Sequence, residues 1–282
     1  MCVIFFYANS QPNANGYKLI LASNRDEFFA RDTQTAAKWS NGDHVYGGID
    51  LEPGREGGTW LAIGGGKGVF KVGALLNLTG EPKPRNAVGR GMIVADYVRQ
   101  TDIEHNIENY NQSLLADCTK YSAFNFVSIE IGSDGQPAQI KLLSNVPPTL
   151  LPFEQGQCYG FGNSLPECPF EKVQYGRKQF EQIVKEFGQS DVETLSAELL
   201  QLLKNKHKFW PDAELERRAP SWGEGLSALN VHIAEHGYGS RTHSLILVDA
   251  NNKMHFIEET MRGLDPSAEW EHTHIEKQFE SS

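Results

Sequence analysis

The chain opens with Met1-Cys2-Val3-Ile4-Phe5-Phe6-Tyr7, a cysteine followed by an apolar run. A small residue at position 2 usually lets aminopeptidase remove the initiator Met1. Cys2 would then carry both a thiol, of ordinary pKa about 8.5, and a free α-amine of pKa about 7.7–8.0 that can accept the thiol proton. This is the terminal-amine form of nucleophilic catalysis. The simpler alternative is a buried, inert cysteine. In either case the apolar run predicts a buried strand.

Composition narrows the class of protein. The chain has 282 residues, of which 39% are hydrophobic, which is enough for a sizeable core. A net charge of −10 argues against a nucleic-acid partner. No segment approaches the ~18 apolar residues of a transmembrane span, and the opening run is shorter than the ~7–15-residue core of a signal peptide. We therefore expect a cytoplasmic protein without a transmembrane segment.

The cysteines and histidines match no metal or haem-attachment motif. The four cysteines contain no C-x-x-C pair, and in a reducing compartment they are expected to be thiols. The nine histidines contain no H-E-x-x-H. The sequence predicts no metal site and no covalent cofactor, although a lone Cys or His could still ligate haem reversibly.

Strands and helices are grouped along the chain rather than alternating. Residues 2–7 and 17–23 favour an antiparallel hairpin, because a turn rich in Asn, Pro and Gly separates them. Further strands are expected at 59–63, 69–77, 124–131, 140–143, near 159–164, and at 229–234, 242–249 and 253–259. Helices are expected at 89–100, 102–115, 171–187 and 192–204, with a loop at Pro147-Pro148 and a connection at 205–226. This grouping predicts an α+β protein with mainly antiparallel sheets and a single domain, 1–282.

The second strand runs into Asn24-Arg25-Asp26-Glu27. Strand alternation puts Asn24 and Asp26 on one face and Arg25 and Glu27 on the other. If this segment curls back across the terminus, Asp26 can orient the amine of Cys2. The alternative is a patch of salt bridges at a strand end.

An amidase also needs hydrogen-bond donors aimed at the developing oxyanion. Asn77, at the end of a strand, and Asn163, in Gly162-Asn163-Ser164, supply amide donors, although such residues commonly just form turns. Arg241, at the start of a strong apolar strand, could bind a substrate carboxylate or support the pocket, although exposure to solvent is commoner.

Several motifs in order along the chain resemble the NRDE family, the family of transport and Golgi organisation protein 2. The motifs are Met1-Cys2, Ser23-Asn24-Arg25-Asp26-Glu27-Phe28, Glu56-Gly57-Gly58-Thr59-Trp60-Leu61, Gly89-Arg90-Gly91, Tyr159-Gly160-x-x-Asn163 and Gly239-Ser240-Arg241-Thr242. The resemblance implies an N-terminal-nucleophile-hydrolase-like fold of four layers, αββα, with Cys2 at the start of a central strand. Asn24, Arg25, Glu27 and Trp60 are then expected to belong to the motif or the pocket.

The resemblance also implies roles for single residues. By analogy with choloylglycine-hydrolase-like relatives, Cys2 is the nucleophile, Asp26 orients it, and Asn77 and Asn163 form the oxyanion hole. Arg241 completes the site. One departure is Ser23, where those relatives usually have an Arg three residues before the Asp.

Two functions follow as expectations. The resemblance implies intracellular haem trafficking, with lipid homeostasis as a related role, and a ligand that is haem or a similar small amphipathic molecule held by Cys2 or by His236. The residues themselves favour an alternative, an N-terminal cysteine amidase that hydrolyses a small or acylated amide. A scaffold with an inactive site is a third reading, and a homodimer is compatible with all three.

Overall fold

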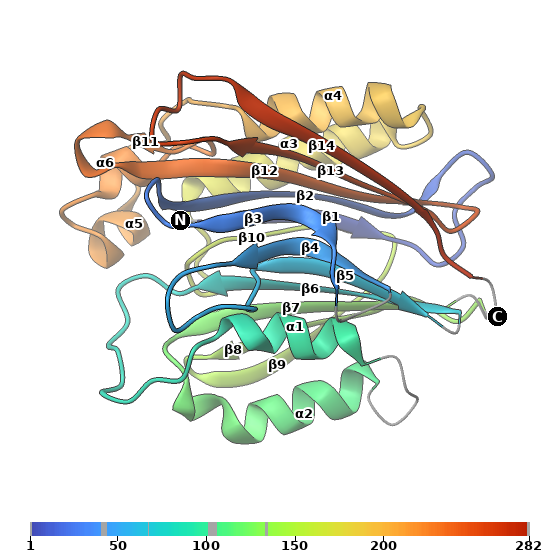
Figure 1. Ribbon diagram of the computed structural model, residues 1–282, viewed down its shortest axis with the longest axis horizontal. Coiled ribbons are helices and arrows are strands. Elements are labelled where there is room, and N and C mark those ends of the chain that lie inside the picture. The colour runs from blue at the N-terminus through green and yellow to red at the C-terminus, as the bar shows by residue number, and fades with distance from the viewer. Residues whose placement is uncertain (1, 41–43, 67, 101–105, 133–134, 281–282) are drawn as a thin grey trace.

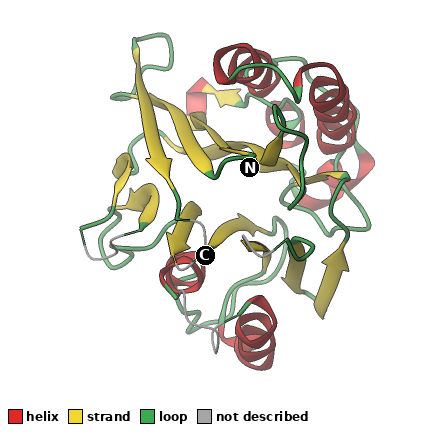
Figure 2. Ribbon diagram, turned by 90° about the vertical axis from the view of Figure 1, so that its right-hand side faces the viewer, coloured by secondary structure: helices red, strands yellow, loops and turns green. Residues whose placement is uncertain are grey.

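The computed structural model describes residues 2–40, 44–66, 68–100, 106–132 and 135–280. Two antiparallel sheets lie face to face, with helices on both outer sides (Figures 1 and 2). Sheet A comprises β1 (Val3–Ala8), β2 (Tyr17–Phe28), β10 (Cys158–Phe161), β11 (His232–Ile233), β12 (Tyr238–Asp249), β13 (Lys253–Met261) and β14 (Trp270–Gln278). Sheet B comprises β3 (Thr33–Lys38), β4 (Val45–Asp50), β5 (Leu61–Gly66), β6 (Val69–Asn77), β7 (Phe124–Gly132), β8 (Gln139–Asn145) and β9 (Pro148–Phe153).

The helices complete four layers. They are α1 (Gly91–Arg99), α2 (Ile107–Asp117), α3 (Glu171–Phe187), α4 (Val192–Leu203), α5 (Ala213–Arg218) and α6 (Gly223–Leu226), with the short 3-10 helices η2 (Cys118–Lys120) and η3 (Ala234–His236). Helices α3 and α4 pack on sheet A, and α1 and α2 pack on sheet B (Figure 1). One apolar core lies between the sheets and one lies under each helix layer. The predicted α+β class and four-layer αββα arrangement are confirmed.

Strand β1 is buried on both faces, which explains its continuous apolar run. Ile4 and Phe6 enter the core between the sheets, whereas Val3 and Phe5 enter the core beneath α3 and α4. The expected hairpin forms, with Val3 opposite Asn24, and β10 pairs with the other edge of β1. The first strand is therefore central in its sheet, and its beginning is held from both sides.

Helix α3 approaches β1 closely at one glycine. A Cβ atom at Gly176 would overlap the ring of Phe5, so only glycine fits at this point of the helix. The Phe5 ring also stacks on Phe180, with ring centroids 6.1 Å apart. This packing fixes β1 against the helix layer behind it.

A buried carboxylate connects the two sheets. Glu258 on β13 accepts hydrogen bonds from the backbone N–H of Ala36 on β3 (2.8 Å) and from the hydroxyls of Ser244 (3.1 Å) and Thr260 (2.9 Å). Burial raises the pKa of Glu258. These hydrogen bonds give the apolar interface between the sheets a polar contact of defined geometry.

Several elements differ from the sequence-based expectation. Strands β3, β4 and β14 were not predicted as such, and the expected loop at Pro147-Pro148 leads directly into β9. β9 is an edge strand, and proline is tolerated at the first residue of such a strand. The strand expected at 229–234 is limited to β11, and the connection at 205–226 contains α5 and α6. Residues 102–105 of the expected second helix lie outside the described residues, and α2 begins at Ile107.

Candidate active site and ligand cavity

Cys2 lies at the entrance to β1, on the face of sheet A that looks toward sheet B. It packs against the core between the sheets, and its Sγ is 3.9 Å from the backbone carbonyl oxygen of Asp26. Burial, together with the nearby Asp26 carboxylate, raises the pKa of the Cys2 thiol. The hairpin register alone brings Cys2 and Asp26 together, because the end of β2 lies beside the start of β1. The chain does not have to curl back across the terminus.

The Asp26 carboxylate points to the opposite face of the sheet. The Ser240 hydroxyl donates a 2.5 Å hydrogen bond to its Oδ1 and accepts one from the backbone N–H of Val231 (2.9 Å). Asn24 is fully buried on the same face as Asp26, as strand alternation predicted. Its amide donates to the carbonyls of Leu203 and Leu229. These contacts secure β2 to the segments that cover it.

Arg25 and Glu27 share the face of the Cys2 thiol. The Arg25 guanidinium carbon lies 4.2 Å from the ring centroid of Trp60, the residue before β5 of sheet B, and an Arg25 nitrogen lies 3.9 Å from a Glu27 carboxylate oxygen. Burial lowers the pKa of Arg25, while Glu27 and Cys2 oppose that shift. Ser23 and Arg25 are alternate residues of β2 and so share a strand face. The Arg25 side chain is therefore on the same face of the sheet as Ser23 and the Cys2 thiol. The Asp26 carboxylate is on the other face.

A cavity of about 660 Å³ opens beside Cys2. Its basic lining residues are Arg25, Arg31, Arg55, Lys83, Arg85 and Arg90, and its acidic ones are Asp26, Glu27, Asp50 and Glu56. Trp60, Leu75 and Met92 supply part of the apolar wall, and Asn77 also lines the cavity. Six basic residues against four acidic ones, of which Asp26 directs its carboxylate to the opposite face of the sheet, make this lining cationic in a chain of net charge −10. The volume is within the ~300–1,000 Å³ usual for ligand pockets.

Two glycine-containing loops build one wall of the cavity. Gly58 and Gly91 meet backbone to backbone, since a Cβ on Gly58 would lie 2.9 Å from the Cα of Gly91. The backbone N–H of Thr59 donates to the Gly91 carbonyl at 3.1 Å. This contact holds Arg55 and Arg90 at the same wall. Burial, together with the charges of Arg55 and Arg31, lowers the pKa of Arg90 to about 10.

Besides the buried Asn24, three predicted site residues do not line this cavity. The Asn163 side-chain amide donates to the Asn77 carbonyl at 2.5 Å, so it fixes the segment that carries Asn77. Arg241 is at a bulge in β12 and donates to the carbonyls of Phe28 (3.0 Å) and Arg31, where it supports the turn after β2. His236 is exposed and stacks on Trp222 with ring centroids 4.5 Å apart.

The basic residues of the glycine-rich loops were missed as functional residues. Gly89-Arg90-Gly91 and Glu56-Gly57-Gly58 carried the family resemblance, but no role was assigned to Arg55 or Arg90. The available signal was arginine beside glycine in two separate loops. Which loops meet is decided by the sheet topology, so sequence alone could not place these residues beside Cys2.

A second cavity, of about 500 Å³, lies on the other side of Asp26. Ser240, which holds the Asp26 carboxylate, lines it together with His243 and Trp270. The His243 ring stacks on Trp270 at 4.9 Å, and its Nδ1 lies 2.6 Å from the Asn24 side-chain oxygen. Burial, assisted by the charge of Lys204, lowers the pKa of His243 to about 3. This histidine is neutral at physiological pH.

Among the described residues, no helix is both long and apolar enough to cross a bilayer.

Two solved structures of Anbu from Hyphomicrobium sp. strain MC1 are similar to this chain. One covers 88% of this chain and 82% of its own, with 12% identity and a TM-score of 0.37. The other, the (Gly-1) mutant, covers 95% and 88%, with 10% identity and a TM-score of 0.39.

Sequence relatives are much closer. Transport and Golgi organization protein 2 of Drosophila melanogaster is 75% identical over 281 residues, which is 100% of this chain and 99% of the fly protein. The Homo sapiens homolog is 32% identical and covers 96% of both chains, and the Bos taurus homolog is 32% identical over the full length of both. The family model for Transport and Golgi organisation 2 matches residues 1–263. This chain therefore belongs to the Transport and Golgi organisation 2 family.

Proposed function

We propose that the chain binds and carries a small amphipathic anion in the cavity beside Cys2. The observation that carries this proposal is the surplus of basic residues around a cavity that is also lined by Cys2 and Trp60, both of which pack against the core between the sheets. Arginine recognises carboxylates and phosphates through paired hydrogen bonds. An apolar group at the other end of the ligand would pack on Trp60 and Leu75.

Haem is the first candidate ligand within this class. It combines a large apolar ring with two carboxylates, and a protein thiolate can serve as its axial ligand. Cys2 lines the cavity, whereas His236 does not, which favours Cys2 over His236 as the ligand to iron. Because burial raises the pKa of Cys2, its thiol is mainly neutral at pH 7 and a weak ligand. Weak ligation suits a carrier that must release its cargo.

A haem titration of the untagged protein tests this proposal. We expect a shifted Soret band for the wild type, a different spectrum for Cys2→Ser, and a wild-type spectrum for the control Cys168→Ser, whose cysteine is exposed. A long-chain fatty acid should compete with haem if the cavity also serves lipid homeostasis. If haem leaves the Soret band unshifted, or if Cys2→Ser matches the wild type, haem carriage through Cys2 is excluded.

A second candidate function is an N-terminal cysteine amidase. Cys2 and Asn77 line one cavity, and Asp26 lies beside Cys2. After removal of Met1, the α-amine would accept the thiol proton, and the sulfur would attack the amide carbonyl carbon. The Asn77 side chain would donate to the oxyanion, the leaving amine would take the proton, and water would hydrolyse the thioester.

Intact-mass measurement separates the two functions. If Met1 is retained, no free amine adjoins the thiol and the amidase is excluded, whereas the carrier is unaffected. If Met1 is absent, a thiol-reactive acyl probe should label Cys2 in the wild type and not in Cys2→Ser. Failure of this labelling on a processed chain also excludes the amidase.

A further inference from the structure

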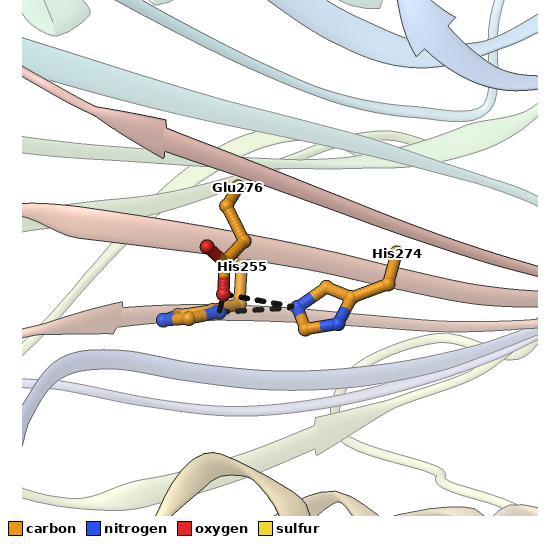
Figure 3. A group of neighbouring side chains, drawn as sticks. All are labelled: His255, His274 and Glu276. Carbon is orange, nitrogen blue, oxygen red and sulfur yellow. Dashed lines mark hydrogen bonds and ion pairs between the residues drawn. The ribbon is translucent and has the colours of Figure 1, made fainter.

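A cluster of two histidines and one glutamate lies on sheet A, away from both cavities. His255 is on β13, while His274 and Glu276 are on the neighbouring edge strand β14 (Figure 3). Glu276 lies directly opposite His255 in the strand pair, and His274 is two residues earlier on the same face. His255 lies in the same row of the sheet as Tyr7, near the end of β1, whereas Cys2 precedes the beginning of β1. The cluster and Cys2 are therefore at opposite ends of the strands. Neither cavity includes these residues.

The donor atoms converge on one point. The Nδ1 of His255 lies 3.1 Å from the Nε2 of His274 and 3.3 Å from a carboxylate oxygen of Glu276, and that oxygen is 4.0 Å from the Nε2 of His274. A tetrahedral zinc site with bonds of about 2.0–2.1 Å places its donor atoms about 3.3 Å apart. Two of the three separations already meet this spacing. The third closes through a small rotation of His274 or Glu276, both of which are partly exposed.

We propose that His255, His274 and Glu276 bind a zinc ion that fastens the edge strand β14 to β13. Two imidazoles and one carboxylate are the ligand set that zinc, a borderline-soft cation, accepts readily. Half-exposed His274 and Glu276 leave a fourth position open to water. The imidazole nitrogens, which now face each other across a hydrogen bond, would both turn lone pairs to the metal.

The surroundings prepare the three ligands. The Lys253 ammonium lies 2.8 Å from the second carboxylate oxygen of Glu276, so the first oxygen is directed at the histidines. Such a contact to the far side of a ligand orients it for the metal. This arrangement also places the positive charge of Lys253 close to the metal cation, which is unfavourable.

The test is titration of the untagged, chelator-treated full chain with Co²⁺ and, by competition with a chromophoric chelator, with Zn²⁺. We expect one equivalent of zinc and a cobalt spectrum of nitrogen and oxygen ligands. His274→Ala should weaken binding at least about tenfold, and so should His255→Gln. The matched control is His272→Ala, which removes an exposed histidine two residues away on the same strand and should bind as the wild type does.

Three results would overturn the zinc site. They are no zinc binding by the wild type, unchanged affinity in His274→Ala, or a thiolate-to-cobalt charge-transfer band that places the metal on a cysteine. A thermal melt adds an independent readout, because a ligand that binds only the folded chain raises its melting temperature. Zinc should raise the melting temperature of the wild type and of His272→Ala but not that of His274→Ala. Equal zinc-induced shifts in all three would also contradict the site.

Discussion

The thiol of Cys2 lies beside the backbone carbonyl of Asp26, 3.9 Å away, while the Asp26 carboxylate occupies the opposite face of the sheet. The two groups therefore lie on opposite sides of sheet A. The thiol faces the basic cavity between the sheets, and the carboxylate is held by Ser240 at the wall of the second cavity. The backbone of residue 26 thus connects the surroundings of the thiol with those of Ser240.

Ser240 is expected to contribute strongly to stability. Ser240→Ala removes a donor to the Asp26 carboxylate and an acceptor for the Val231 N–H. We expect a loss of about 1–3 kcal/mol in the free energy of unfolding, because buried polar groups lose their partners. Urea denaturation measures it. Ser113→Ala, at an exposed site on α2, is the control, and equal effects of the two variants would contradict the prediction.

The Cys2 thiol should react slowly at neutral pH. Its raised pKa leaves little thiolate, so its rate of alkylation should still be increasing with pH above about 8.5, the ordinary thiol value. Peptide mass spectrometry of iodoacetamide-treated protein gives the rate at this residue alone. A rate that levels off below that pH would be inconsistent with a raised pKa.

Arg55 should strengthen the binding of anions. Arg55→Met removes one exposed cation from the cavity lining, and we expect about tenfold weaker binding of haem or of a fatty acid, the value of one charge-assisted hydrogen bond. Equilibrium titration at two salt concentrations measures this change. Arg262→Met, at an exposed arginine outside the cavity, should leave affinity unchanged. If the two variants bind alike, Arg55 does not contact the ligand.

Glu258 should make stability depend on pH. Its raised pKa means that folding takes up a proton, so the free energy of unfolding falls as pH rises from the ordinary glutamate value, about 4.3, through the pKa of the folded state. Glu258→Gln cannot ionise and lacks this decrease. Urea denaturation between pH 4.5 and 8 should show a difference between variant and wild type that grows with pH. A constant difference would argue against the raised pKa.

Gly176 should resist substitution despite its helical position. Alanine usually favours a helix by about 1 kcal/mol over glycine, but its Cβ here overlaps the ring of Phe5. We expect Gly176→Ala to lose about 1–3 kcal/mol, as overpacked cores do. Thermal or urea unfolding decides the sign, with Gln179→Ala on the exposed side of α3 as the control. If Gly176→Ala instead stabilises the protein, β1 must shift to accommodate the added Cβ, and the prediction is wrong.

Local patterns predicted the first hairpin and the α+β class with antiparallel sheets, whereas the four-layer arrangement followed from the family resemblance. The apolar run after Cys2 and the alternation in Asn24-Arg25-Asp26-Glu27 fix which side chains face which layer, because strand geometry leaves only two choices. Strand β14 was missed because an edge strand carries charged and polar residues, here Trp270 to Gln278, and lacks a clear apolar alternation.

The composition of the cavity could not be read from the sequence. Arg55 and Arg90 lie in loops with no strand pattern, and their approach depends on the backbone contact between Gly58 and Gly91. Arg241, in contrast, was predicted to be a site residue but does not line the cavity. Its position at the start of a strong strand suggested a pocket residue, but a bulge in β12 directs it to the carbonyls of Phe28 and Arg31.

The contrast between a cationic cavity and a chain of net charge −10 has a consequence for selectivity. A long polyanion would meet the negative field of the whole surface before any of it reached the arginines, and it would be repelled. A compact anion feels the focused potential of the cavity mouth once it is within about 10 Å, the screening distance at 0.1 M salt. We therefore expect the protein to select anions by size, so that it binds small anionic metabolites and repels nucleic acids.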